Sequence, residues 1–405
     1  MSYESIYQNI MDLPVFDTHT HLETGWRQST KGLYARNFFD ICRYFWFQRE
    51  QQAAGYYPAE VKDGENEVTP ERAEELHEAL RRIRNTYWTR TVMEAMENLY
   101  GIRPDSVDRI LELSEAMGKN LSNREWGNQV CDKIGIRKTV MGPGGTPQGT
   151  VLDADVDLIA DRIVRVPAYR FGKALKGFDE VDAHLKVDEF KEQIKAQVES
   201  YRASGYRAVR AAWPFLKDET GATQTDFSAE ELKDKANLSQ HLGHFLFRLL
   251  EEHGSCLQIF FGMGRSGAQN DTTHVSSMHG IFKMYPGLTF NLFCAAELSS
   301  LDMVQAARIY PNVYPGGLWW FTFRRSVYES NMQYRVEALP ASRASFVASD
   351  ARCIEWSYIK ILLIKKVMAR FFHNQIEEGW LDEDAALYTA RHWLHDTAEQ
   401  LYCPE

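Results

Sequence analysis

Two histidines separated by one residue, His19 and His21, follow the first apolar run of the chain. In a β-strand, side chains alternate between the two faces, so both imidazoles would point the same way. Neutral imidazoles that converge in this manner can bind a divalent metal ion if at least one more ligand comes from elsewhere. The pattern is weak alone, but Ser349-Asp350-Ala351-Arg352 also ends an apolar run. Two predicted strands therefore end in polar side chains that could do chemistry.

Glycine-rich stretches begin at Gly142 and Gly262, each directly after a predicted strand. Neither has the downstream acidic residue of a dinucleotide-binding fingerprint, so we interpret both as tight loops at the rim of the fold. The second loop also carries Arg265 and leads to His274. Loops that follow strands often hold functional residues, and these two side chains are candidates for ligand binding.

The composition limits the class of protein. The chain has 405 residues, of which 44% are hydrophobic and 25% charged, as in ordinary globular proteins. A net charge of −10 argues against a general binder of nucleic acid or of anionic membranes. Six scattered cysteines and the lack of a signal-like or membrane-spanning stretch predict reduced thiols and a cytoplasmic location.

The pattern changes to helical periods over residues 37–128, including residues 70–88, where apolar spacing alternates with dense charge. We interpret residues 37–128 as a helical insertion, with residues 1–36 and 129–405 forming the main domain. The aromatic run Tyr44-Phe45-Trp46-Phe47 fits the core of the insertion, with a wall of the substrate site as the alternative. Aromatic residues in this insertion also favour assembly into a homo-oligomer.

Short apolar runs alternate with amphipathic segments along the main domain. Helices are expected at Val187–Ala203 and at residues 230–253, the latter ended by Gly254. With the first strand at residues 15–22, the candidate strands number eight; the others are residues 136–141, 162–166, 208–212, 257–262, 288–293, 313–319 and 345–349. This α/β pattern predicts a closed (β/α)8 TIM-type barrel with a helical insertion after the first strand. An open, doubly wound sheet is the alternative.

Several short motifs occur in an order that resembles the uronate isomerases of the amidohydrolase superfamily. They are His19-Thr20-His21, Val166-Pro167-Ala168-Tyr169-Arg170, Gly205-Tyr206-Arg207-Ala208, Gln258 with Gly262, Gly317-Leu318-Trp319-Trp320-Phe321 and Ser349-Asp350-Ala351-Arg352. The resemblance covers most of the chain, from Phe16 to about Lys366. It implies a barrel enzyme, identified as a divergent member of that family.

The resemblance also implies a mononuclear site with one divalent metal ion, zinc, bound by His19, His21 and Asp350. Arg352 would lie beside Asp350 and help to keep its carboxylate ionised, because a neighbouring positive charge favours that form. Tyr34 resembles the first-loop tyrosine that moves a proton in the family. Asp350, Tyr34 and Arg352 are thus the expected catalytic residues, with the role of Asp350 open between metal ligand and base.

The substrate implied by the resemblance is a small sugar acid. Arg170 would hold its carboxylate, since a guanidinium binds that group in a planar, bidentate way. Trp319 and Trp320 would form walls for the sugar, and Arg265 and His274 would contribute from the loop after the fifth strand. No nucleic-acid or membrane partner is expected.

Three positions depart from the family pattern, because Phe260, Leu33 and Ala211 occur where the family usually has histidine. These departures bear on the reaction more than on the fold or the metal. His274 could replace one of the missing histidines.

Three functions therefore stay open. The first is aldose–ketose isomerisation of a uronic acid, and the second is metal-dependent hydrolysis or lyase cleavage of a sugar-acid lactone, amide or glycoside. The third is a non-catalytic sensor of sugar acids, which would have little need of all four of His19, His21, Asp350 and Arg352.

Overall fold

The computed structural model describes residues 2–22, 33–58, 67–142, 157–212, 223–261, 275–294, 297–318 and 324–404. Its strands are β1 (Val15–Asp17), β2 (Ile136–Met141), β3 (Ile163–Arg165), β4 (Ala168–Tyr169), β5 (Ala208–Ala212), β6 (Cys256–Phe261), β7 (Thr289–Cys294) and β8 (Val313–Leu318). All pairings between them are parallel, in the orders β1-β2-β3 and β4-β5-β6-β7-β8.

Backbone hydrogen bonds connect these two groups of strands into one ring. On one side, Val166 N donates to Met141 O of β2, and Arg210 N of β5 donates to Pro167 O. The predicted strand at residues 162–166 corresponds to β3, and the extended chain continues into β4, which was not predicted. The ring is the parallel barrel that the sequence predicts.

The other side of the ring is closed by residues 345–351. Ser345 N donates to Pro315 O of β8, and Thr18 N donates to Val347 O. Thr20 and Ala351 form a parallel bridge farther along. The prediction of a regular strand at residues 345–349 is wrong in detail, because this segment is extended but keeps few regular ladder bonds. Likewise β1 ends at Asp17, so His19 and His21 lie just beyond it.

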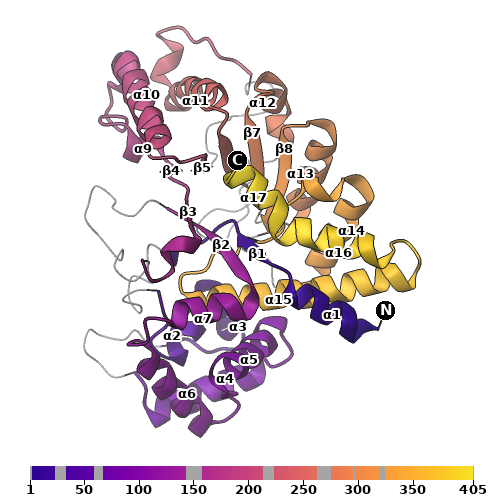
Figure 1. Cartoon of the computed structure of the whole chain (residues 1–405). Coiled ribbons are helices and arrows are strands. Elements are labelled where there is room, and N and C mark those ends of the chain that lie inside the picture. Colours follow the sequence, from indigo (N-terminus) through magenta and orange to yellow (C-terminus); the bar gives the residue numbers. More distant parts are fainter. Residues whose placement is uncertain are drawn as a thin grey trace.

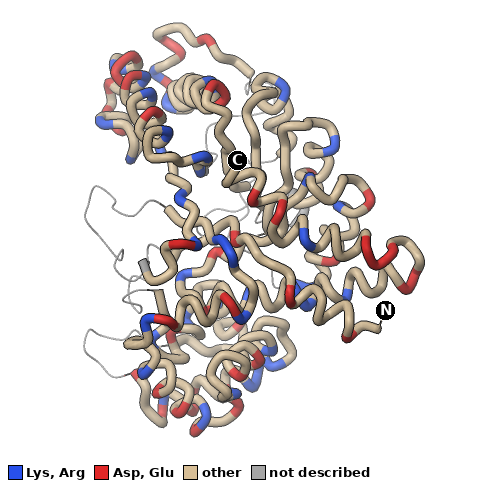
Figure 2. The backbone as a smooth tube through the Cα atoms, in the orientation of Figure 1, with Lys and Arg blue, Asp and Glu red and all other residues tan. Residues whose placement is uncertain are grey.

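Helices surround the barrel and form a separate group beside it (Figure 1). They are α1 (Tyr3–Asp12), α2 (Phe38–Cys42), α3 (Phe45–Ala53), α4 (Pro70–Arg82), α5 (Tyr87–Tyr100), α6 (Val107–Asn120), α7 (Trp126–Ile134), α9 (Phe171–Ala174), α10 (Val187–Ala203), α11 (Lys235–Glu252), α12 (His279–Met284), α13 (Glu297–Ile309), α14 (Arg325–Ala338), α15 (Ile354–Glu377), α16 (Glu383–Arg391) and α17 (Thr397–Tyr402). Acidic and basic residues are interspersed along the outer helices (Figure 2). Within the described ranges, no helix is both long and apolar enough to cross a membrane.

The helices α2 to α7 follow one another between β1 and β2, and no strand occurs among the residues described there. The expected helix at residues 70–88 is two helices, because the chain leaves α4 after Arg82 and restarts at Tyr87. Thr86 caps the second helix by accepting a hydrogen bond from Thr89 N, and α5 ends at Gly101 with a φ of 70°. The spacing of charged residues continues through this turn, so the sequence pattern did not predict it.

A buried cluster packs inside the ring of strands and includes Ala208 and Cys256, the first residues of β5 and β6. It takes residues from successive strands and is completed by the C-terminal helix α17; its members are Phe16, Val140, Val166, Ala208, Cys256, Ala398 and Tyr402. The Tyr402 hydroxyl donates to Asn291 Oδ1 (2.6 Å) and accepts from Gln258 Nε2 (2.7 Å). The helix α17 therefore seals this end of the barrel and leaves the carboxyl ends of the strands for function.

Arg335 of α14 fastens the closing segment to β8. Its side chain is fully buried and donates to Ser345 O and to Gly316 O, both at 2.7 Å. Its guanidinium also lies 4.6 Å from the centre of the Phe346 ring. Three contacts from one cation thus hold two neighbouring strands of the ring together.

We expect Arg335→Met to lower the free energy of unfolding by about 3 kcal/mol, because two charge-assisted hydrogen bonds are lost. Methionine carries no charge, so the variant avoids the cost of burying one, and this offsets part of the loss. Urea unfolding followed by circular dichroism measures this change. Arg308→Met is the matched control, since Arg308 is exposed on α13. A loss below about 1 kcal/mol, or an equal loss in both variants, contradicts the role given to Arg335.

Candidate metal centre

His19, His21 and Asp350 meet at the carboxyl ends of the first and last strands of the ring. Asp350 Oδ1 lies 3.2 Å from His19 Nε2 and 3.1 Å from His21 Nε2. The two imidazole centres are 4.9 Å apart. The ligand atoms of all three residues lie within 4.8 Å of one another. The two histidines therefore point the same way, as alternation along an extended chain requires.

The backbone places these side chains. Asp350 N donates to His19 O, and His21 N donates to Ala351 O, both at 2.8 Å. Asp350 has a φ of 53°, in the left-handed region that aspartate tolerates better than most residues. This turn directs its carboxylate back over the histidines. The hydroxyl of Thr20, between the two histidines, donates instead to Val140 O on the other face.

Electrostatics favour the metal-binding forms of Asp350 and His19. Burial alone would raise the pKa of Asp350, but hydrogen bonds from His19 and His21 and the charge of Lys360 hold it well below its usual range. Burial lowers the pKa of His19 to about 3, with the charge of Arg210 acting in the same direction against the effect of Asp350. At neutral pH the site thus offers a carboxylate beside a neutral imidazole.

The second carboxylate oxygen of Asp350 faces a different partner. The Tyr44 hydroxyl donates to Asp350 Oδ2 (3.1 Å), and Lys360 Nζ donates to the Tyr44 oxygen (2.6 Å). Tyr44 and Lys360 are both buried. Burial lowers the pKa of Lys360 to about 8, while Asp350 and Asp17 oppose this shift, so the amine is mostly protonated at neutral pH. Lys360, Tyr44 and Asp350 therefore form a chain of hydrogen bonds from a buried cation through a phenol to a carboxylate.

The sequence assigned proton transfer to Tyr34, whose hydroxyl accepts from Gly127 N (3.1 Å) and donates to Arg124 O (3.3 Å) at the start of α7. The hydroxyl that reaches Asp350 in the described structure belongs to Tyr44. The role of Tyr34 stays a prediction, and Tyr44 is a second candidate for it. Arg352 is half-buried, and its charge acts on Tyr44 and Lys360.

The structure places Arg170 at the end of β4, exposed and directly before α9. The other expected substrate residues, Trp319, Trp320, Arg265 and His274, lie outside the described residues. The four remain predictions from the resemblance.

Aromatic side chains form a wall beside His19. The ring of Phe260 lies 4.6 Å from the His19 ring and stacks on Phe293 at 5.0 Å, with an interplanar angle of 23°. These two phenylalanines are register partners on β6 and β7. Leu33 and Ala211, the other two positions at which the resemblance would place histidine, are both buried. The side of His19 that faces Phe260 is therefore apolar.

The sequence analysis gave no role to Lys360 or Arg210, and it considered Tyr44 only as core or as a wall of the substrate site. Arg210 is buried on β5, opposite Gln258 of β6, and its charge acts on His19. One signal was available for Lys360, which interrupts the apolar run from Ile359 to Ile364, because a lysine inside a buried helix needs a partner.

The residues present fit a metal ion. Two imidazole nitrogens and one carboxylate oxygen are a usual set of protein ligands for zinc and for other first-row divalent ions, and they leave positions open for substrate. The spacing of 3.1–3.2 Å between nitrogen and oxygen suits neighbouring ligands of one ion.

A second group of potential ligands lies after α16 and at the start of α17. His395 Nδ1 lies 2.9 Å from Asp396 Oδ1 and 3.6 Å from Glu399 Oε2. Arg391 already pairs with Asp396 at 2.8 Å, and Glu399 is exposed. Neutralisation by arginine makes this group the weaker candidate.

The sequence matches no protein-family model and no curated protein closely enough to count. Solved structures match over nearly the whole chain. A uronate isomerase of Bacillus halodurans has a TM-score of 0.71 at 16% identity, covering 98% of this chain and 95% of that chain. A glucuronate isomerase of Caulobacter crescentus has a TM-score of 0.72 at 15% identity, covering 99% and 93%.

The chain has the fold of the uronate isomerases. A protein of Lactobacillus casei, named for a proposed metal-dependent hydrolase activity, also matches with a TM-score of 0.63 at 14% identity, covering 98% of this chain and 97% of that chain. These likenesses confirm the predicted barrel fold.

We expect purified protein to hold about one equivalent of a divalent transition metal, and His19→Ala to lose it. Elemental analysis measures the metal, and the thermal midpoint of chelated protein should rise when zinc is added, because a ligand of the folded state stabilises it. His395→Ala is the matched control and should keep both properties. Metal that survives His19→Ala, or disappears in His395→Ala, contradicts the assignment.

Proposed function

We propose that the chain is a metal-dependent enzyme that interconverts the aldose and ketose forms of a uronic acid. The observation that carries this proposal is that the two carboxylate oxygens of Asp350 have different partners. Its Oδ1 faces the two histidines, while its Oδ2 accepts a hydrogen bond from the Tyr44 hydroxyl. One carboxylate can thus serve the metal and a proton-transfer group at the same time.

Isomerisation requires a proton to leave one carbon and arrive at its neighbour through an enediolate. A phenol hydrogen-bonded to a carboxylate can perform both steps. As Tyr44 gives its proton to Asp350 Oδ2, its oxygen can take the proton from the hydroxyl-bearing carbon. Tyr44 then gives this proton to the neighbouring carbonyl carbon and takes its own proton back from Asp350. The hydroxyl proton of the first carbon moves to the carbonyl oxygen of the second, so the aldose and the ketose carry the same number of protons. Lys360 supports the charge that develops on the phenol oxygen, because its amine donates to that atom.

When bound, the metal ion supplies positive charge that polarises the oxygens of the substrate. The chain contributes further cationic groups. The charge of Arg352 acts on Tyr44 and on Lys360, and the Lys360 amine donates a hydrogen bond to the Tyr44 oxygen. In the proposed complex, Arg170 holds the substrate carboxylate. The stacked rings of Phe260 and Phe293 offer an apolar surface that suits the C–H face of a sugar.

Metal-dependent hydrolysis of a sugar-acid derivative is the second candidate. The observation that favours it is Phe260 beside His19, where a family histidine is missing. The Lactobacillus casei protein of the same fold is named for such a reaction. In this alternative Asp350 acts as base for a water molecule, and Tyr44 orients Asp350.

For isomerisation, we expect glucuronate or galacturonate to give a ketose in deuterated water, with exchange at the carbon next to the aldehyde. Tyr44→Phe should lower kcat by about 10²–10⁴-fold with little change in KM, because it removes a proton-transfer group and no binding contact. Proton resonance spectra follow both products and exchange.

Tyr285→Phe is the matched control, because its hydroxyl bonds to His244 on the outer helices. It should keep the wild-type rate. Metal-loaded protein that yields neither ketose nor exchange, but cleaves a lactone or amide of a sugar acid, supports hydrolysis. Saturable uronate binding without any turnover indicates a sensor.

A further inference from the structure

A cavity of about 420 Å³ lies away from the metal centre, where α5 meets α1, α14 and α15. Its floor is apolar and comes from Leu363 and Val367 of α15. Tyr3 and Tyr87 contribute aromatic side chains to its walls. The residues placed in the metal centre do not line it, so the cavity needs its own explanation.

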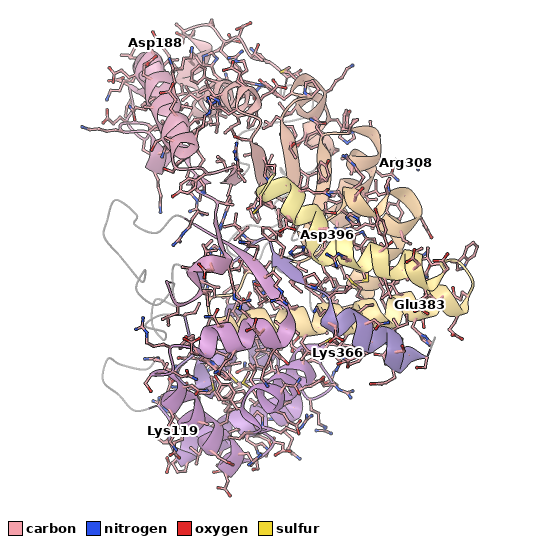
Figure 3. All side chains as sticks on the ribbon, in the orientation of Figure 1. Lys119, Asp188, Arg308, Lys366, Glu383 and Asp396 are labelled. Carbon is pink, nitrogen blue, oxygen red and sulfur yellow. The ribbon has the colours of Figure 1, made fainter. Side chains whose placement is uncertain are left out.

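Positive charge is concentrated around this cavity. Its lining contains five basic side chains and a single acidic one: Arg90, Arg103, Arg325, Lys366, Arg370 and Glu94. The whole chain carries a net charge of −10, so the positive lining of this cavity is opposite in sign to the net charge of the chain. Lys366 lies on the side of α15 toward α5, with which it pairs (Figure 3). A concave basic surface attracts anions.

Three of the five cations have carboxylate partners. Arg103 pairs with Glu97 at 2.9 Å, Arg325 with Glu329 at 2.6 Å, and Lys366 with Glu94. These ion pairs neutralise part of the lining.

Two guanidinium groups are left without such neutralisation. Among the residues that the structure describes, neither Arg90 nor Arg370 has a carboxylate within ion-pair distance. Arg370 lies over the ring of Tyr3, 3.9 Å from its centre, which orients the side chain without cancelling its charge. The cavity thus presents two guanidinium charges, one from α5 and one from α15.

We propose that this cavity binds a small phosphorylated ligand. A phosphate group carries up to two negative charges and several acceptor oxygens, so it can satisfy both guanidinium groups together. The apolar floor and the tyrosine walls suit an organic body attached to the phosphate. The proposal is independent of the reaction at the metal centre.

The cavity is lined by α15, the helix that also carries Lys360. Lys366 and Arg370 belong to the same helix as Lys360, which donates to Tyr44. Lys366 is six positions after Lys360 in the helix, which corresponds to about 9 Å along the axis. A ligand in the cavity therefore contacts the helix that supports the metal centre.

Inorganic pyrophosphate is the probe for the test, titrated into the full chain in a calorimeter at about 0.15 M salt so that weak surface attraction is screened. We expect saturable binding at about one site per chain. The double variant Arg90→Gln, Arg370→Gln should weaken binding at least tenfold. Arg308→Gln is the matched control, because Arg308 is exposed on α13, far from α15 in Figure 3, and it should bind as the wild type does.

Unchanged urea unfolding shows that a variant is folded, and Arg90→Gln alone serves if the double variant is not, since Arg90 is exposed on the surface of α5. Lack of saturable binding overturns the proposal, as does equal affinity in the wild type and the variant. Citrate that binds as tightly as pyrophosphate overturns the assignment of a phosphate ligand. Metal content and turnover stay unaffected by these outcomes, so a failure here is distinct from a failure of the proposed reaction.

Discussion

The contacts of Asp350 join the two ends of the barrel and at the same time arrange the candidate metal ligands. Its backbone N–H bonds to His19 O, its Oδ1 faces both histidines, and its Oδ2 accepts from Tyr44. The left-handed backbone of Asp350 costs about 1–2 kcal/mol, which the surrounding contacts must offset. Barrel closure and ligand geometry are therefore one constraint, since neither can shift without the other.

Buried cations on α15 extend this constraint to the helical region. Lys360 donates to Tyr44, which precedes α3, while Lys365 donates to Met11 O, Leu13 O and Ile134 O. A buried ammonium group needs such partners, because desolvation without them costs several kcal/mol. The helix α15 is thus tied to the N-terminal segment, to α7 and to the metal centre, which explains why it is buried on nearly all sides.

Regular periodicity made much of the fold predictable. The helix at Val187–Ala203 and the strand at residues 208–212 agree with α10 and β5, because their apolar patterns are local. The turn between α4 and α5 was missed, since the cap at Thr86 is a single residue within a continuous charged pattern. Residues 345–351 depend on bonds to β1 and β8 that no local pattern encodes.

The candidate site also contains both features that are local in sequence and features that depend on long-range contacts. The spacing of His19 and His21 is local, so their common direction could be predicted from alternation alone. Tyr44 and Lys360 are separated by 316 residues, and their hydrogen bond exists only in the folded chain. The resemblance directed attention to Tyr34, whose hydroxyl bonds to the backbone before α7. Long-range contacts of this kind limit any assignment of roles from sequence.

The apolar side chain of Phe260 has a physical consequence for the chemistry of the site. Phe260 packs on His19 and helps to keep water from it, and burial holds that imidazole neutral, as a metal ligand requires. The same exclusion of water strengthens the interaction between Tyr44 and Asp350, because charges interact more strongly at low dielectric. Phe260 therefore suits a neutral His19 but offers no proton carrier beside it. In the proposed reaction, the proton transfers must then pass through the Tyr44–Asp350 pair.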